Sequence, residues 1–272
     1  MDNVFVLLLA GFFVGTLGTL IGAGGGFILV PLLLLTHPDL PPDIVTAISM
    51  AIVAANAISG SIAYARSGRI DYHSGILFAV FTVPGSIAGV YLTAFIPQTV
   101  FHVLFGILLI GLASFLFLSK NSRPGDGGAY HKRATQVTLT DAGGTRYLYR
   151  YRRYMGILIS LAVGFISPVL GIGGGIIHVP ALVKWLHFPV YIATATSHFI
   201  LAVMATVSVA THIAQGSYAD PAVLRMVLLL GAGAVAGAQA GAFLSHRIQG
   251  PAIVRALAIC LALVGLRILI IH

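Results

Sequence analysis

The sequence of 272 residues contains no glutamate, only one cysteine and few charged residues of any kind. The lone cysteine, Cys260, excludes an intramolecular disulfide framework and a cysteine-based metal site. Seven aspartates supply all of the side-chain carboxylates, and none of them lies in the middle of an apolar run. A buried carboxylate relay, which moves protons or sodium in many membrane proteins, therefore has no obvious candidate here.

Charged residues make up 8% of the chain and hydrophobic residues 58%, with a mean hydropathy of +1.00. Soluble domains are about 25% charged, so this composition predicts an all-α, polytopic membrane protein. The net charge is +8, and eight of the fifteen Lys and Arg residues lie between positions 119 and 154. Nucleic-acid binding is one interpretation of this cluster. A cytoplasmic loop that obeys the positive-inside rule is favoured, so no nucleic-acid partner is expected.

Two glycine-rich breaks interrupt apolar runs that are otherwise long enough to enter a membrane. Residues 22–26 are Gly-Ala-Gly-Gly-Gly and residues 171–175 are Gly-Ile-Gly-Gly-Gly, so the copies are 149 positions apart. Each glycine costs a helix about 1 kcal/mol relative to alanine. Such a break at membrane depth is tolerated only where it is buried in protein or lines a cavity. Paired breaks in the two halves of a chain indicate a binding site between the halves.

The breaks divide the chain into two similar halves. We expect a first transmembrane repeat at residues 1–118, a basic cytoplasmic loop at 119–153 and a second repeat at 154–272. Alternating residues on either side of positions 141–144 predict a small β-hairpin in the loop, and a linker that folds locally is favoured over a regulatory or partner-binding lobe. Each half would hold a glycine-broken, re-entrant hairpin (4–36; 154–186) and three spanning helices (43–65, 73–95, 98–118; 191–214, 221–244, 251–271).

Loop charges indicate that the halves are inverted repeats. Residues 37–43 carry acidic side chains, whereas the corresponding residues 184–187 carry basic ones. Residues 66–69 are basic, whereas the corresponding residues 215–220 contain an aspartate and neither Lys nor Arg. The positive-inside rule requires this reversal if the halves are inverted, with five segments in each and both termini outside. Parallel repeats of four spans, in which each hairpin is one kinked span, are the competing topology.

The residues around both breaks resemble a known family. Residues 18–27 (GTLIGAGGGF) with Val30-Pro31, and residues 167–175 (SPVLGIGGG) with Val179-Pro180, are similar to the motif of the sulfite exporter TauE/SafE family, also called the four-toluene-sulfonate uptake permease family. The resemblance covers almost the whole chain outside the loop. It implies a secondary transporter of a small sulfur-containing anion (sulfite, thiosulfate, a sulfonate or a related organosulfonate) in the cell inner membrane.

Other functions and partners follow from the same residues. A channel-like anion pore and a non-transport membrane partner in sulfur metabolism are the alternatives. An enzyme is disfavoured because Cys260 has apolar neighbours, no carboxylate lies within a span and no metal-ligand spacing occurs. We expect no cofactor and no metal. The expected partners are the anion and membrane lipids, and a homodimer is left open.

A sulfur oxyanion needs N–H donors and positive potential with little steric bulk. Glycines let the backbone approach a ligand closely. A helix that restarts at Phe27 or Ile176 would point unpaired N–H groups and the positive end of its dipole at the break. Close packing of small residues between helices is the alternative explanation. The candidate substrate-binding residues are Gly22, Gly24, Gly25, Gly26, Phe27, Gly171, Gly173, Gly174, Gly175, Ile176, Ser49, Asn56, Thr194, Ser197 and His198.

The polar candidates lie in the spans that follow the breaks. The spacings of Ser49, Asn56 and Ser59 predict that they share a helix face. Thr194 and Ser197 occupy the related turn of the second half, next to His198. Hydrogen bonds between helices or to the preceding turn explain such residues equally well. His198 would donate to the anion or carry a coupled proton, and a neutral core histidine is an equal alternative.

Overall fold

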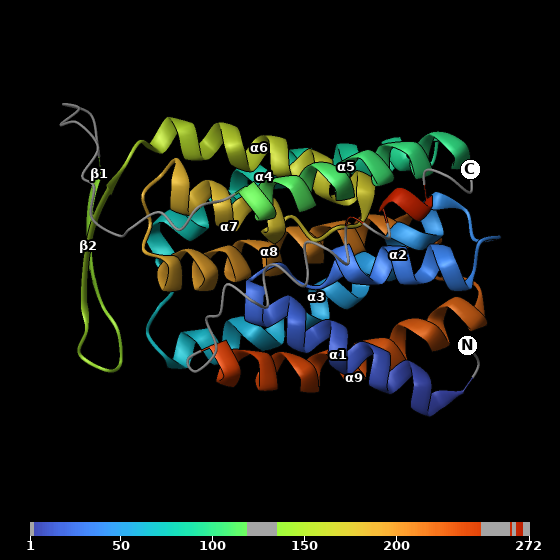
Figure 1. The fold of residues 1–272 in the computed structure, drawn as a ribbon, viewed down its shortest axis with the longest axis horizontal. Coiled ribbons are helices and arrows are strands. Elements are labelled where there is room, and N and C mark those ends of the chain that lie inside the picture. The colour runs from blue at the N-terminus through green and yellow to red at the C-terminus, as the bar shows by residue number, and fades with distance from the viewer. Residues whose placement is uncertain (1–2, 119–134, 246–261, 263–264, 269–272) are drawn as a thin grey trace.

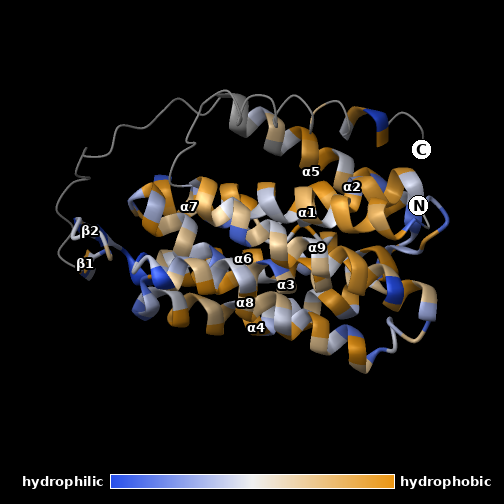
Figure 2. Ribbon diagram, turned by 90° about the horizontal axis from the view of Figure 1, so that it is seen from below, coloured by the Kyte–Doolittle hydropathy of each residue, from blue (hydrophilic) through white to orange (hydrophobic). Residues whose placement is uncertain are grey.

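The computed structural model describes residues 3–118, 135–245, 262 and 265–268. These residues form a bundle of helices with a two-stranded sheet at one end (Figure 1). The N-terminus and the sheet lie at opposite ends of the bundle in both views (Figures 1 and 2). The elements are α1 (Val4–Ile21), α2 (Gly26–Thr36), α3 (Pro42–Arg66), α4 (Tyr72–Thr93), α5 (Gln98–Leu118), β1 (Thr135–Thr140), β2 (Arg146–Tyr151), α6 (Arg153–Leu170), α7 (Gly175–Lys184), α8 (Val190–Ala214) and α9 (Pro221–Ser245).

Six of the described helices are long and apolar enough to cross a membrane: α1, α3, α4, α6, α8 and α9. This finding confirms the prediction of an all-α, polytopic membrane protein. Helices α2 and α7 have 11 and 10 residues, so each extends about 16 Å, roughly half of the 30 Å apolar thickness of a bilayer. The last predicted span, 251–271, lies almost entirely outside the described residues.

The loops gather at two ends, and the Arg-containing residues 66–69 and 146–153 lie at the end that holds the sheet. At the end that holds the sheet, Arg69 pairs with Asp141 of the hairpin turn at 3.4 Å, and the N–H of Ala142 donates to the Ser67 carbonyl. We call this the basic end. At the other end, the Gln98 side chain donates to the Pro38 carbonyl. Hydrophobic residues dominate the length of the helices between these ends (Figure 2).

The β-hairpin is anchored to the helices by two buried tyrosines of β2. The Tyr149 hydroxyl donates to Asp71 Oδ2 at 2.7 Å, and the Tyr151 hydroxyl lies 2.6 Å from Ser74 Oγ. Asp71 is the N-cap of α4, where its Oδ1 accepts from the Ser74 N–H. Burial and the adjacent Asp71 carboxylate raise the pKa of Tyr149, so its hydroxyl keeps the proton that it donates. Phe188 packs on both tyrosine rings.

The two halves interlock rather than lying side by side. Helix α1 of the first half packs along α9 of the second, and α6 packs along α4. Corresponding glycines permit both contacts: a Cβ atom added to Gly15 would lie 2.7 Å from Ala234 Cα, and one added to Gly164 would lie 2.7 Å from Thr82 Cα. Small residues allow such close approach between membrane helices.

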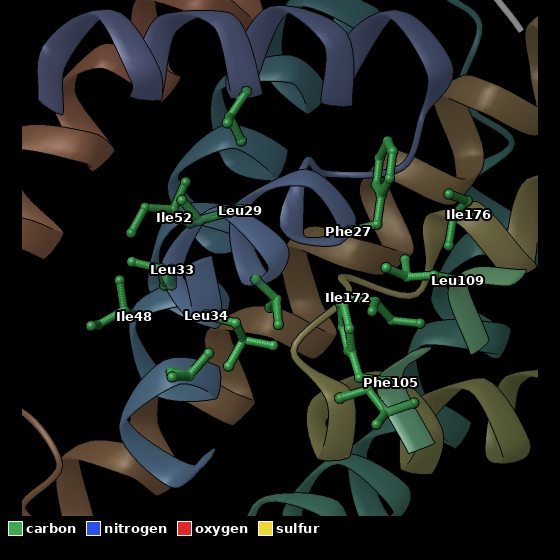
Figure 3. Close-up of a cluster of buried hydrophobic side chains, with 14 of the residues drawn as sticks. Phe27, Leu29, Leu33, Leu34, Ile48, Ile52, Phe105, Leu109, Ile172 and Ile176 are labelled. Atoms are coloured by element: carbon green, nitrogen blue, oxygen red, sulfur yellow. The ribbon is translucent and has the colours of Figure 1, made fainter. Parts of the chain in front are cut away.

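The short helix α2 lies inside the hydrophobic core. Leu29 and Leu33 of α2 point toward Ile52 of α3, while Leu109 of α5 lies beside Ile172 of the second break (Figure 3). Because the core contains residues from both breaks, packing holds the two breaks deep inside the molecule.

Candidate functional site

Each break ends one helix and starts another within four residues. Helix α1 ends at Gly22, which adopts a left-handed conformation with φ of 78°, and the N–H groups of Ala23 and Gly24 return to the Gly18 carbonyl. Positive φ values continue at Gly24 and Gly25 before α2 begins. Side chains with a Cβ atom rarely adopt this conformation, and glycine adopts it freely.

The second break repeats the first. Helix α6 ends at Gly171 with φ of 66°, and Gly173 and Gly174 have φ of 76° and 52°. Each short helix also contains a proline at its sixth residue, Pro31 in α2 and Pro180 in α7. Proline has no N–H group and crowds the carbonyl four residues earlier. The backbone hydrogen bond from this position is therefore missing in both helices, about one turn after the break.

The two breaks cross in contact with each other. A Cβ atom added to Gly175 would meet the Gly22 carbonyl and lie 2.7 Å from Ala23 Cα. A Cβ atom added to Gly26 would meet the Gly171 carbonyl and lie 2.8 Å from the carbonyl carbon of Ile172. The contact is reciprocal, because the start of α2 packs on the end of α6 and the start of α7 packs on the end of α1.

Backbone N–H groups remain at both helix starts. Within the described residues, the N–H groups of Gly25 and Phe27 take part in no backbone hydrogen bond, and neither do those of Gly174 and Ile176. The first N–H groups of any helix lack partners within it, and they carry the positive end of its dipole. The N–H group of Gly26 likewise forms no backbone hydrogen bond in the described part of the chain, so the crossing combines five such donors with two helix N-termini.

Helices α3 and α8 cover the crossing with corresponding faces. Each face consists of residues at the same four positions, offset by 148: Thr46, Ser49, Val53 and Asn56 on α3, and Thr194, Ser197, Leu201 and Met204 on α8. Added Cβ atoms at the break glycines would contact Thr46, Val53, Thr194, Leu201 and Met204. Spacings of three and four residues keep these positions on one side of a helix.

The hydrogen bonds of these faces are not symmetric. Ser49 Oγ donates to the Gly171 carbonyl at 2.6 Å, whereas the Oγ of the corresponding Ser197 has no partner although it is fully buried. Asn56 accepts from Thr19 Oγ1 at 2.9 Å, and its Nδ2 is unpaired. Unpaired buried polar atoms cost free energy, and the atoms beside the crossing are available to hydrogen-bond a ligand.

His198 belongs to a polar cluster that we define as Thr19, Asn56, Tyr64 and His198. His198 Nε2 lies 3.3 Å from Thr19 Oγ1, and the imidazole also interacts with the backbone carbonyl of Gly22. The Tyr64 hydroxyl donates to the Thr19 carbonyl at 2.9 Å. A Cβ atom added to Gly60 would lie 2.6 Å from His198 Nε2, so glycine there makes room for the imidazole.

In this conformation the crossing is closed. The side chains of Val53, Leu201 and Met204 are almost completely buried. A Cβ atom added to Gly24 would lie 2.5 Å from Leu201 Cδ2 and 3.0 Å from Val53 Cγ1. A solute therefore needs these apolar side chains to move before it can reach the N–H groups.

Some predicted residues have other roles. Ser59 does not share the face of Ser49 and Asn56, because it donates to the Val235 carbonyl of α9. The Thr194 hydroxyl donates to the Val190 carbonyl within its own helix. The side chains of Phe27 and Ile176 lie in the hydrophobic core, so only their backbone can face a ligand.

Thr19 and Tyr64 were not among the predicted site residues, although Thr19 lies inside the first motif. Contacts between helices that are distant in sequence reveal both of them. The spacing of residues along one helix contains no signal for such contacts.

Comparisons with known proteins agree with this architecture. The family model described as sulfite exporter TauE/SafE matches residues 7–268. The probable membrane transporter protein YunE of Bacillus subtilis is 32% identical over 97% of this chain and 96% of its own length. YdhB of the same organism, also a probable membrane transporter, is 26% identical over 97% of this chain and 99% of its own.

A more distant relative is the probable membrane transporter protein MJ0441 of Methanocaldococcus jannaschii, which is 28% identical over 71% of this chain and 66% of its own length. No solved structure matches the chain significantly. The match over nearly its whole length places this chain in the sulfite exporter TauE/SafE family of membrane transporters.

Proposed function

We propose that this protein is a secondary transporter that binds a small sulfur oxyanion where the two glycine breaks cross. Sulfite, thiosulfate, a sulfonate or a related organosulfonate is the proposed substrate class, in keeping with the family description. The observation that carries the proposal is the presence of free backbone N–H groups at the crossing together with the unpaired polar atoms of Asn56 and Ser197, which lie on the two faces that cover it.

The chemistry of the crossing suits an anion. Helix N-termini attract negative charge because their N–H groups and dipoles point at the ligand. Asn56 Nδ2 is a further donor, and Ser197 Oγ can donate because it is bonded to nothing else. The aspartates that the structure describes lie in loops or at helix ends, so no carboxylate of these residues opposes an anion at the crossing.

The closed crossing favours a carrier over an open pore. We infer that the halves are inverted repeats that move against each other, which is a common route to alternating access. Three features support this relation: the reversed loop charges, the reciprocal contact of the breaks and the matched faces of α3 and α8. Rocking would withdraw Val53 and Leu201 from the glycines and expose the N–H groups to one side at a time.

Uptake of labelled sulfite and thiosulfate into proteoliposomes tests the proposal. The informative variant is Ser197→Ala, because the Ser197 hydroxyl has no partner in the protein and its loss should not impair folding. Its matched control is Ser208→Ala in the same helix, where the buried hydroxyl donates only to the Met204 carbonyl. Asn56→Met gives the first half the residue that the second half has at the corresponding position. Its control is Met50→Leu in the same helix, a buried methionine outside the face that covers the crossing.

A hydrogen bond to a charged ligand contributes about 1.5–3 kcal/mol, so each site variant should bind the anion about 10- to 100-fold more weakly. Both controls should transport as the unaltered protein does. Unchanged uptake by Ser197→Ala and Asn56→Met would refute the site at the crossing. Transport of neither anion by the unaltered protein would refute these two substrates.

A further inference from the structure

A groove runs along the outer surface between α3 and α9, away from the crossing. Its volume is about 460 Å³, and its walls are mainly apolar. Ile58 and Ile62 of α3 and Val235 of α9 line it, and each of these side chains is 43–50% exposed. Because both helices are candidate membrane spans, the surroundings of the groove are lipid.

The polar groups in the groove are bonded to each other. Gln239 Nε2 donates to both the carbonyl and the Oγ of Ser59 at 2.8 Å, and Ser59 Oγ donates to the Val235 carbonyl at 2.9 Å. These hydrogen bonds hold α3 against α9. An occupant of the groove therefore need not hydrogen-bond to this part of the lining, and a hydrocarbon chain can lie against it.

The length of the groove matches one leaflet of a bilayer. Ala55 and Arg66 line its two ends and are 11 residues apart on α3, which corresponds to about 16 Å along the helix. Half of a bilayer's apolar thickness is about 15 Å. Arg66 is the last residue of α3, at the basic end, so the groove extends inward from the headgroup level of that leaflet.

Arg66 supplies a cation at the headgroup end. It is exposed, and among the described residues it forms no ion pair. The corresponding residue of the second half is Ala214, and Ile62 corresponds to Ala210. Arg66 and Ile62 are therefore features of one half only, and the internal repeat does not account for them.

We propose that this groove binds one anionic phospholipid of the leaflet on the basic side. Its phosphate pairs with Arg66, and an acyl chain lies along Ile62 and Ile58 toward Ala55. Basic pockets between membrane helices recognise anionic headgroups through the same combination of a cation and an apolar cleft. This site is separate from the proposed oxyanion site and does not depend on which solute is transported.

Thermal-shift titration of the purified, detergent-solubilised full chain tests the proposal, with phosphatidylglycerol compared with phosphatidylcholine. Phosphatidylglycerol should raise the melting temperature at lower concentration. Arg66→Gln should weaken its apparent affinity about fivefold, the effect of one cation near an anionic surface, and leave phosphatidylcholine unaffected. Arg152→Gln removes a partly exposed cation at the same end, outside the groove, and should change neither titration.

A second pair of variants tests the groove itself. Ile62→Trp fills the groove and should abolish stabilisation by both lipids, whereas Ile76→Trp changes an exposed isoleucine near the basic end of α4 and should not. Equal stabilisation by the two lipids, or equal loss in Arg66→Gln and Arg152→Gln, would overturn the proposal. A dimer in lipid-free detergent that dissociates in Ile62→Trp would also overturn it, because a second copy would then occupy the groove.

Discussion

The glycines at the crossing serve two different purposes. Gly22, Gly24 and Gly25 have positive φ values, so their role is conformational. Gly26 and Gly175 start helices without a positive φ value, and their role is contact: a side chain on either would strike the opposite break. A substitution at Gly175 therefore tests the crossing without straining the local backbone.

We predict that Gly175→Ala lowers the free energy of unfolding by about 1–3 kcal/mol, the usual effect of overpacking. Its Cβ atom would meet the Gly22 carbonyl and lie 2.7 Å from Ala23 Cα. Gly231→Ala is the control, because the nearest atom to its Cβ would be 4.0 Å away, and a mid-helix alanine should be neutral or stabilising by up to about 1 kcal/mol. Denaturant unfolding in detergent measures both, and equal stability of the two variants would contradict the contact.

Spacing along one helix indicated the site residues only in part. It placed Ser49 and Ser197 in the turns that face the crossing, because the 148-residue offset relates those two turns. It assigned Ser59 to the wrong face, since 10 residues from Ser49 to Ser59 leave a rotation of about 80°. The closure by Val53 and Leu201 was not predicted, because apolar residues in an apolar span carry no distinguishing pattern.

At the scale of elements, β1 and β2 are the only regular elements of the described chain that are not helices. The turn between them is held by Asp141, which pairs with Arg69 and accepts the Thr145 N–H at 2.9 Å. That backbone hydrogen bond, with the Tyr147 hydroxyl and Arg69, holds the pKa of Asp141 below its usual value. The alternating pattern predicted the strands, but nothing in it indicated that Tyr149 reaches the N-cap of α4.

We predict that Tyr149→Phe loosens the hairpin. The change removes a donor from Asp71, a buried carboxylate, and loss of such a hydrogen bond costs about 1–3 kcal/mol. Leu148→Ala, at the adjacent exposed position of the same strand, should have little effect. Limited proteolysis at residues 135–151 measures the difference: faster cleavage of Tyr149→Phe alone supports the anchor, and equal rates for both variants would contradict it.

At the scale of the whole molecule, the boundaries of the described helices agree with the predicted ones within about two residues. Local signals explain the agreement, since Pro42 and Pro221 begin α3 and α9 and Asp71 caps α4. The packing of α1 on α9 and of α4 on α6 was not predicted. Gly85 and Gly233 are 148 positions apart, and both lie at these contacts between helices. Glycine is so frequent in an apolar chain, however, that such a correspondence between the halves does not stand out in the sequence.

Labelling of single cysteines tests the proposed orientation. In a Cys260→Ser background, a membrane-impermeant maleimide added to intact cells should label Ala219→Cys in the loop before α9. It should not label Thr138→Cys in the hairpin until the cells are opened. Both positions are exposed, so a difference reports sidedness. Labelling of Thr138→Cys in intact cells would contradict a cytoplasmic basic end.

The most direct measurement for the oxyanion site is a crystal structure with selenite, in which anomalous scattering locates the selenium. Selenite has the charge and shape of sulfite, so it should occupy the same donors. The account predicts a selenium peak within hydrogen-bonding reach of Asn56 Nδ2 and the N–H groups at the starts of α2 and α7. In Asn56→Met crystals soaked at the same selenite concentration, it predicts a weaker peak. A peak elsewhere in the membrane region, or none at saturating selenite, would contradict the binding of an oxyanion where the breaks cross.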